Sequence, residues 1–342
     1  MDISRLAAVC GRWIKSAVKS LRDIAARRPE SISLALCIIM VLMLGITVPK
    51  YFFSSHNLNS LATATAPEGI VALGMMMLLI SGVFDLSVGS VMCLGGLVAA
   101  IGLSAGFSTP IALALGLGSG LVIGLCNGLI TEVAGVNPLI TTIGMMYIVR
   151  GITEITLVKR GKAGYGNFPA DFRIIGQGKI FGVPFMFWLL LLFAVLFAVF
   201  LIRRRGGRRI YLIGGNEAAA SALGVKKRKI RIILFMLAGI LAALAGILIN
   251  ARAGAANRYT GQNSHLNVII ACIIGGGSLA GGKGNMGGAV FGTLFLVLLN
   301  NAFNLYQVNQ HVQSLVNGMV LLAVVVVDGY MNIIKRRELG KE

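Results

Sequence analysis

A succession of long apolar runs separated by polar stretches constrains this chain more than any other feature. A helix of about 20 apolar residues crosses the hydrocarbon core of a bilayer, and most of the runs reach or approach that length. The pattern therefore predicts an all-α polytopic membrane protein with about ten transmembrane helices. The runs cover residues 31–49, 59–82, 86–104, 109–132, 137–157, 183–202, 232–251, 266–280, 286–304 and 312–328.

The composition and the placement of charge exclude two other classes of protein. Of the 342 residues, 56% are hydrophobic and 13% are charged, whereas soluble domains average about 25% charged residues. The net charge of +19 does not indicate a nucleic-acid-binding protein, because the basic residues form blocks that flank the apolar runs. Such blocks set membrane orientation.

The distribution of basic residues predicts the orientation. If the N-terminus is cytoplasmic, ten crossings return the C-terminus to the cytoplasm, with 22 of the 31 Lys and Arg inside and eight outside. Basic residues favour the cytoplasmic side. We therefore expect a cytoplasmic arm at 1–30, a transmembrane domain at 31–330 and a cytoplasmic tail at 331–342. The first run reaches spanning length, so we expect it to stay as an anchor.

The longest internal polar stretch, residues 203–231, carries ten of the Lys and Arg at its two ends. Between these ends, Asn216–Leu223 is rich in Ala, which favours helix. Asn216 is suited to cap that helix, and Glu217 falls in its first turn. We predict a short cytoplasmic helix, held between two basic anchors that also contact anionic lipid, on which another protein pushes.

Two of the runs differ from simple lipid-facing helices. Pro67 and Glu68 interrupt the run 59–82, and the short run 266–280 ends in three glycines. Breaks at membrane depth are tolerated where the backbone is buried in protein or lines a cavity. We therefore predict broken or re-entrant segments in both places.

Glycines recur every four residues in two runs. This spacing places them along one ridge of a helix and lets a second helix approach closely. The pattern predicts tight packing for both helices. The two sets are Gly116, Gly120, Gly124 and Gly128, and Gly284, Gly288 and Gly292.

Ionisable residues in or near the runs need partners, because a charge at mid-bilayer costs roughly 2.5–3.5 kcal/mol on insertion scales. Arg150 and Glu154 are four residues apart, and we expect them to pair on one helix. Asp85 precedes Leu-Ser-Val-Gly and is expected to cap a helix that starts at the cytoplasmic face. Glu68 and Glu132 remain without an assigned partner.

Neutral polar residues within the runs admit two interpretations. They form hydrogen bonds between helices, or they contact a neutral, polyhydroxylated substrate. The sequence leaves both open. The residues are Asn127, Asn300, Asn301 and Asn304.

Motifs with a chemical appearance do not predict catalysis. The segment 277–283 fits seven places of a phosphate-binding loop, but Gly284 replaces the Ser or Thr that would hold Mg²⁺, and no strand is expected before it. Gly102–Gly106 spells a nucleophile-elbow pattern without a strand or partner residues. The five Cys include no CxxC pair. We expect no catalytic residue, no metal and no cofactor in this chain.

Five segments, in order, resemble the permeases of bacterial ABC importers for monosaccharides, of the ribose, xylose, arabinose and galactoside type. They cover about residues 60–330, and they are SGVFDLSVGS at 81–90, NPLITTIG at 137–144 with Arg150-Gly151, GGNEAA at 214–219 with Gly224, GGGSLAGGKG at 275–284 and NNAFNL at 300–305.

This resemblance implies an ABC importer permease fold in the bacterial inner membrane. It implies a subunit that forms a dimer with a second permease copy, two cytoplasmic ATPase subunits that bind ATP, and a periplasmic binding protein that delivers the sugar. The implied ATPase-coupling residues are Gly215, Asn216, Glu217, Ala218, Ala219 and Gly224.

The chain departs from the resembled family at Ser264–Asn267, where relatives carry an acidic "E-L-D-A" segment. Two negative charges are thereby removed from the expected outer mouth. We assign the substrate pathway to Asn127, Asn300, Asn301, Asn304 and Glu68.

The alternative function is a self-sufficient secondary transporter or channel for a small neutral solute. It would need a relay of buried carboxylates, for which Glu68 and Glu132 are the candidates.

Overall fold

The structure, a computed structural model, describes residues 30–159 and 164–338. Its helices are α2 (Glu30–Thr47), α3 (Pro49–Phe52), α4 (Ser55–Ile80), α5 (Val88–Ser104), α6 (Thr109–Glu132), α7 (Pro138–Lys159), α8 (Ala170–Gln177), α9 (Phe185–Arg203), α10 (Arg205–Gly215), α11 (Glu217–Ala222), α12 (Lys227–Ala253), α13 (Ser264–Ile274), α14 (Met286–Leu305) and α15 (Gln310–Glu338). Two short antiparallel pairs complete it, β1 (Gly164–Gly166) with β4 (Ala255–Asn257) and β2 (Lys179–Ile180) with β3 (Val183–Pro184).

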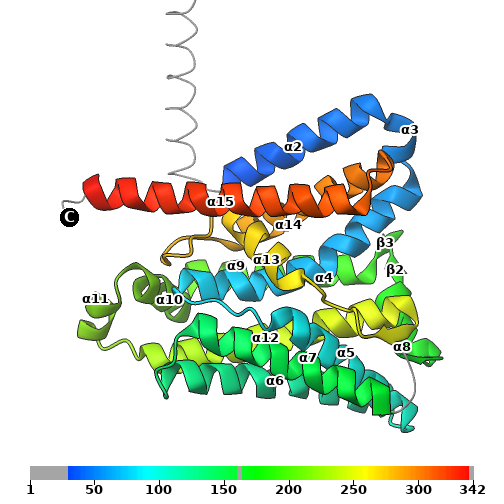
Figure 1. The fold of residues 1–342 in the computed structure, drawn as a ribbon, viewed down its shortest axis with the longest axis horizontal. Coiled ribbons are helices and arrows are strands. Elements are labelled where there is room, and N and C mark those ends of the chain that lie inside the picture. The colour runs from blue at the N-terminus through cyan, green and yellow to red at the C-terminus, as the bar shows by residue number, and fades with distance from the viewer. Residues whose placement is uncertain (1–29, 160–163, 339–342) are drawn as a thin grey trace, which may run out of the picture.

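The long helices run back and forth between two ends of the molecule (Figure 1). Helices α10 and α11 lie at the left end of this view, and α8 with the β2–β3 hairpin lies at the right end. Within the described residues, each of the ten expected runs contains one helix. Seven of these helices are long and apolar enough to cross a membrane, namely α2, α4, α6, α9, α12, α14 and the Gln310–Tyr330 part of α15.

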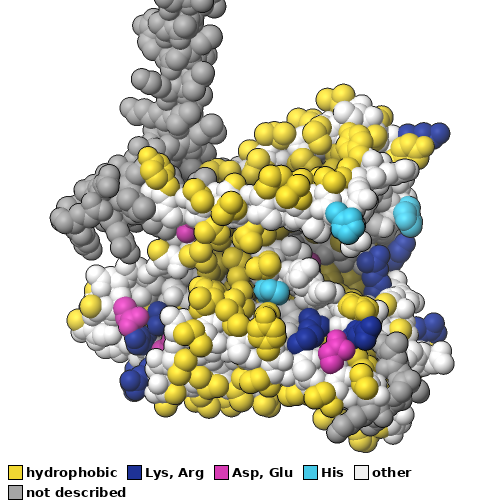
Figure 2. All heavy atoms as spheres, in the orientation of Figure 1, with side chains coloured by type: hydrophobic (Ala, Val, Ile, Leu, Met, Phe, Trp, Pro, Cys, Tyr) yellow, Lys and Arg dark blue, Asp and Glu magenta, His cyan; other side chains and the backbone are white. Residues whose placement is uncertain are grey.

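The surface has the charge distribution of a membrane protein. Figure 2 shows Lys, Arg, Asp and Glu side chains mostly near the two ends, with hydrophobic side chains over most of the surface between them. This arrangement agrees with helices that cross a bilayer from end to end. The chain is therefore a multi-pass membrane protein.

Helix α4 forms the centre of the core. Its residues from Ile70 to Ile80 are all buried, and it packs against α9, α12, α13 and α14. A helix that is apolar all round is expected inside a bundle. The predicted break at Pro67 is wrong, because α4 continues through this residue. Neighbouring helices cover it on all sides, which allows a proline within a transmembrane helix.

The real interruptions precede α5 and follow α12. Helix α13 has 11 residues, about 16 Å at 1.5 Å per residue, and its first residue, Ser264, bonds to Glu68 in the middle of α4. Helix α13 therefore starts inside the molecule, as a half-length helix. The run 266–280 is thus not a simple spanning helix, as the sequence predicts, and its re-entrant course stays a prediction.

The segment before α5 is also non-helical and mostly buried. Asp85 is 1% exposed, and its Oδ1 accepts bonds from the backbone N–H of Ser87 (2.7 Å) and from the Ser87 hydroxyl (2.6 Å). Asp85 does order the start of α5, as expected. The N-cap of α5 is Ser87, and the expected position of this helix start at the cytoplasmic face stays a prediction.

The glycine ridge of α6 packs against α12, as the spacing predicts. A Cβ on Gly120 would clash with the carbonyl oxygen of Gly239, and one on Gly124 with that of Phe235. In the second set, Gly288 and Gly292 face the backbone of Gly275 and Ala271 in the same way. Close backbone approach is the reason why these positions hold glycine.

The terminal segments are described only in part. Residues 1–29, most of the predicted basic arm, and residues 339–342 lie outside the described residues. Helix α15 continues to Glu338, so the predicted boundary between span and tail near residue 330 falls within a helix.

Candidate functional site

A cavity of about 360 Å³ lies beside the N-terminal half of α4. Residues of α4, α12, α13 and α14 form most of its wall. Its polar lining consists of Ser60, Thr63, Glu68, Arg252, Asn267, Thr293, Asn300, Asn301 and Asn304. The volume falls in the range of small-molecule sites, about 300–1,000 Å³.

Four of the five predicted pathway residues line this cavity: Glu68, Asn300, Asn301 and Asn304. Asn301 exchanges two hydrogen bonds with Asn57 of α4, of 2.6 and 3.3 Å. Asn300 accepts a bond of 3.3 Å from Asn317 of α15. These two amides hold helices together, which confirms the first interpretation of the sequence for them, and their place in the cavity wall leaves contact with a substrate a prediction.

The fifth predicted residue, Asn127, lies elsewhere. It is fully buried, and its amide donates to Asp85 Oδ2 (3.1 Å) and to the Ser87 hydroxyl (2.9 Å). It fixes the irregular segment before α5 against α6 and does not line the cavity. Asn127 therefore lies apart from the other four predicted residues, and its place in the substrate pathway stays a prediction.

Glu68 occupies the start of the half-length helix α13. Its Oε1 accepts a bond of 2.6 Å from the Ser264 hydroxyl, while Oε2 is buried without a hydrogen-bond partner among the described residues. The free N–H groups at a helix start favour a carboxylate there. The starting point of α13 at mid-membrane thus explains how an acidic residue is held within α4.

Asn267, one turn into α13, also lines the cavity. Within the described part of the chain, its side chain has no hydrogen-bond partner, and the same holds for Asn304. Amides of this kind donate and accept hydrogen bonds. The wall of the cavity therefore offers neutral polar groups to a ligand that carries hydroxyls.

A second candidate site is the exposed helix α11 at one end of the molecule. Asn216 caps it, since its Oδ1 accepts a bond of 3.0 Å from the N–H of Ala219, as the sequence predicts. Of the residues in α11, only Ala220 is buried. Gly224 follows with φ of +74°, a conformation that favours glycine.

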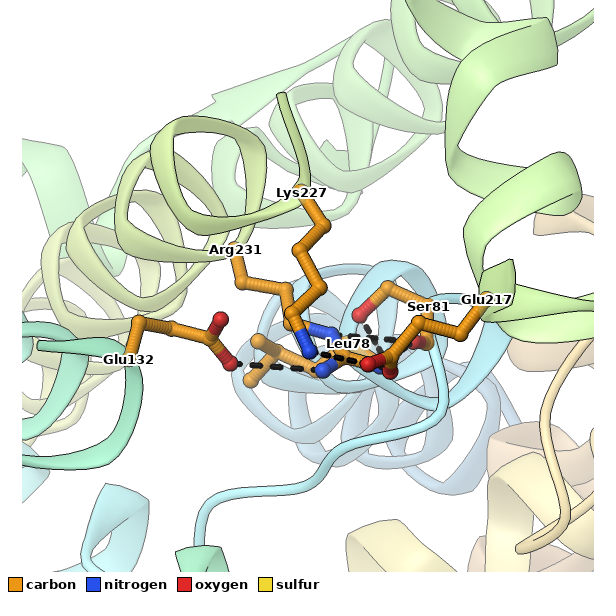
Figure 3. A network of polar contacts seen from close by, with 6 residues as sticks. All are labelled: Leu78, Ser81, Glu132, Glu217, Lys227 and Arg231. Atoms are coloured by element: carbon orange, nitrogen blue, oxygen red, sulfur yellow. Dashed lines mark hydrogen bonds and ion pairs between the residues drawn. The ribbon is translucent and has the colours of Figure 1, made fainter. Parts of the chain in front are cut away.

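A cluster of charged groups joins α11 to the bundle (Figure 3). We call Ser81, Glu132, Glu217, Lys227 and Arg231 the Arg231 cluster. Arg231 donates to the Ser81 carbonyl oxygen through Nη2 (2.7 Å) and Nε (3.2 Å). It also pairs with Glu132 Oε1 (3.4 Å) and Glu217 Oε2 (3.3 Å), while Lys227 binds Glu217 Oε1.

The charges shift the ionisation of Glu217, which lies outside the membrane-spanning segments. The hydrogen bond from the Lys227 ammonium is the main cause that lowers the pKa of Glu217, and the Arg231 charge adds to it. Partial burial opposes the shift. Glu217 is therefore ionised at neutral pH and available as an acceptor for both cations.

The predicted pairing of Arg150 with Glu154 is wrong. Arg150 Nη1 donates to the carbonyl oxygen of Arg258 (2.7 Å), and Glu154 Oε2 lies 3.9 Å from Arg258 Nη1. Both side chains of α7 thus reach the turn after β4. This turn leads to α13, so tertiary contacts satisfy the charges that the spacing had assigned to one helix.

The glycine-rich segment 275–285 is a packing loop between α13 and α14. The N–H of Gly282 donates to the Ile80 carbonyl oxygen (2.9 Å), and the Tyr211 hydroxyl donates to that of Gly284 (2.7 Å). A helix precedes the segment where a phosphate-binding loop requires a strand. Through these hydrogen bonds the segment connects α10 with the C-terminal end of α4.

Sequence reasoning missed several residues of both sites. Thr63, Arg252 and Asn267 line the cavity, and Arg231 and Ser81 join α11 to the core. In the sequence, Arg231 was counted among the basic residues of 203–231 that set membrane orientation. Arg231 directly precedes Ile232, the first residue of an apolar run, and this position could have indicated that its side chain enters the bundle.

Comparisons with known proteins cover most of the chain. Residues 57–325 match a family model described as "Branched-chain amino acid transport system / permease component". The chain is 36% identical over 300 residues to the ribose import permease protein RbsC of Escherichia coli (strain K12), which covers 87% of this chain and 93% of the relative.

Two further relatives show similar agreement. The chain is 37% identical over 298 residues to the L-arabinose transport system permease protein AraH of Escherichia coli (strain K12), covering 87% of this chain and 90% of the relative. It is 34% identical over 291 residues to the ribose import permease protein RbsC of Bacillus subtilis (strain 168), covering 85% and 89%. No solved structure matches the chain.

Proposed function

The chain belongs to the family of ABC transporter permease components that the branched-chain amino acid transport model describes, and from this membership we propose that it is the membrane-spanning subunit of an ATP-driven importer for a monosaccharide. Relatives of 36–37% identity named for ribose and L-arabinose support the substrate class. The sugar is a pentose or hexose delivered by a periplasmic binding protein.

The observation that carries this proposal is the cavity and its lining. A monosaccharide is neutral and presents several hydroxyls, each of which donates and accepts a hydrogen bond. Asn267, Asn304 and Ser60 supply neutral partners at the wall, and apolar residues such as Met186 supply the remaining surface. Specificity in such sites comes from a few polar groups on a largely apolar wall.

Energy enters this subunit through α11. The proposed contact with the ATPase subunit consists of Gly215, Asn216, Glu217, Ala218, Ala219 and Gly224, all of which are exposed. An exposed helix held to the bundle at few points suits a surface that a partner moves. ATP is bound by that partner, and this chain uses no cofactor of its own.

We assign the end of the molecule that carries α11 to the cytoplasm. Glu30, at the start of α2, accepts a bond from Asn285, and Asp328 of α15 accepts one from Ser278. These contacts support both termini on the same side as α11, because Tyr211 of α10 bonds to the adjoining Gly284. Ten crossings and a dimer with a second permease copy complete the proposal.

Transport then follows from alternating access. Closure of the two ATPase subunits on ATP displaces α11, and the helices that wall the cavity tilt so that it opens first to one side and then to the other. The half-length helix α13 gives the wall its movable part, since it is not a continuous spanning helix.

The test is reconstitution in proteoliposomes with the ATPase subunit and the binding protein. We expect uptake of radiolabelled ribose or L-arabinose only when all three components and ATP are present. Uptake by the chain alone, driven by an ion gradient, would instead establish the secondary transporter. The two candidate relay carboxylates argue against that outcome, because Glu132 pairs with Arg231 and Glu68 bonds to Ser264.

A further inference from the structure

Arg231 is a buried cation at the start of α12, where the sequence would place a solvent-facing anchor. Its side chain is 10% exposed, and that of its partner Glu132 is 4% exposed. A buried charge that loses its partners is strongly destabilising. Arg231 therefore has to remain close to the groups that neutralise it.

The partners of Arg231 belong to three different elements. The Ser81 carbonyl oxygen lies at the C-terminal end of α4, Glu132 is the last residue of α6, and Glu217 is the first residue of α11. Unpaired carbonyls at a helix end carry partial negative charge and attract a cation. One guanidinium thus joins the ends of two core helices to the exposed helix (Figure 3).

The attachment of α11 to α12 depends on the Arg231 cluster. Ala220 is the one buried residue of α11, and the ion pairs of Glu217 with Lys227 and Arg231 are its ties to α12. Glu217 itself is 45% exposed, so a partner that moves α11 also reaches it.

Helix α4, which the Arg231 cluster contacts at Ser81, extends to the cavity. Ser81 directly follows α4, and Ser60, Thr63 and Glu68 of the same helix line the cavity. The residues from Ile70 to Ile80 of α4 are all buried, so we expect this part of the helix to pass a displacement at its end on to Glu68, which lines the cavity. We propose that Arg231 is a positioning residue that transmits displacement of α11 to α4 and thereby to the cavity. This inference rests on the proposed role of α11 as the ATPase contact.

Hydrogen–deuterium exchange of the full chain in lipid nanodiscs tests the role of the Arg231 cluster in the absence of the ATPase subunits and the binding protein. In Arg231→Gln, we expect exchange to accelerate about fivefold or more, both in residues 216–224 and in residues 78–87. Arg228→Gln removes an exposed charge from the same turn of α12 and should change neither segment. Faster exchange in one segment alone, or in neither, would overturn the proposal.

A second variant covers the case in which Arg231→Gln does not fold. Arg231→Lys keeps the positive charge but cannot reach Ser81 and both carboxylates with one planar group. We expect a folded protein, by its thermal unfolding, in which the same two segments exchange faster. Wild-type exchange in the lysine variant would overturn the proposal.

Transport provides the functional readout in the complete complex. With Arg231→Lys, we expect ATP hydrolysis to continue while uptake of ribose or L-arabinose per ATP falls about fivefold or more, and with Arg228→Gln the ratio should stay at the wild-type value. An unchanged ratio in Arg231→Lys would contradict transmission through Arg231. If the wild-type complex transports no pentose or hexose, the proposed function fails, and the exchange experiment still decides the role of Arg231.

Discussion

Asn267 shows how a single residue acquires a role from its surroundings. In the sequence it belongs to a segment that departs from the resembled family and was assigned to the outer mouth. In the structure it lies one turn into a half-length helix and lines the cavity beside Ser264, which holds Glu68. The departure from the family pattern thus lies in the cavity wall.

Replacing Asn267 with Leu should weaken transport. The change keeps the size of the side chain but removes its hydrogen-bond groups, and we expect the apparent KM for the sugar to rise about tenfold, since an unpaired sugar hydroxyl costs about 1–3 kcal/mol. Uptake measured against sugar concentration checks this. Gln262→Leu, outside the cavity, is the control, and an equal rise in KM for both variants would contradict the assignment.

The ion pairs of Glu217 should make the thermal stability of the chain depend on pH. The pKa of Glu217 is lowered in the folded protein, so its contribution is present above the pKa of an unfolded glutamate and is lost as the pH falls through the lowered value. We expect wild type to unfold at a higher temperature than Glu217→Gln at neutral pH. The difference should vanish at strongly acidic pH, and a difference that stayed constant with pH would count against the ion pairs.

At the scale of elements, the contact between α6 and α12 is set by glycine. The spacing of four glycines predicted a close partner but did not identify it. The structure places α12 there, with the carbonyl of Gly239 against Gly120. Gly118, on the same helix, has nothing near the position of a Cβ, which provides a matched pair of sites.

We predict that Gly120→Ala destabilises the protein and that Gly118→Ala does not. The added methyl of Gly120→Ala meets a backbone atom that cannot move aside, and overpacking of this kind costs about 1–3 kcal/mol. Gly118→Ala gains helix propensity without a clash. Thermal unfolding in detergent measures both, and equal unfolding temperatures for the two variants would show that α6 and α12 are not in close contact.

At the scale of the whole molecule, the two candidate sites are related by their positions along the bundle of helices. Charged groups gather at the two ends of the bundle (Figure 2), and hydrogen bonds place the start of α2, the loop before α14 and α15 at the end that carries α10. The cavity lies beside the N-terminal half of α4, and α11, the proposed ATPase contact, lies toward the other end of the bundle.

Proteolysis of sealed vesicles should reveal that side. We expect trypsin to cleave after Lys226, next to α11, in inside-out vesicles and to leave this site intact in right-side-out vesicles. Cleavage at Lys226 only from the outer side would reverse the orientation, and no cytoplasmic ATPase would then reach α11.

The sequence alone determined the features that depend on local composition. Apolar runs of about 20 residues indicate helices, because a helix of that length crosses the bilayer and satisfies its own backbone hydrogen bonds in lipid. Asn216 before an Ala-rich segment indicates the start of α11. Glu68, Asn300, Asn301 and Asn304 were also grouped from the sequence, because polar residues in such runs need partners or water, and they line one cavity.

Tertiary structure alone decided which groups meet. Arg150 and Glu154 bond to the turn at Arg258 instead of to each other, Asn127 holds Asp85, and Arg231 joins α4, α6 and α11. The depth at which α13 begins was likewise invisible, since a half-length helix and a full span have similar composition. Such contacts join residues far apart in the chain, and spacing along one helix carries no information about them.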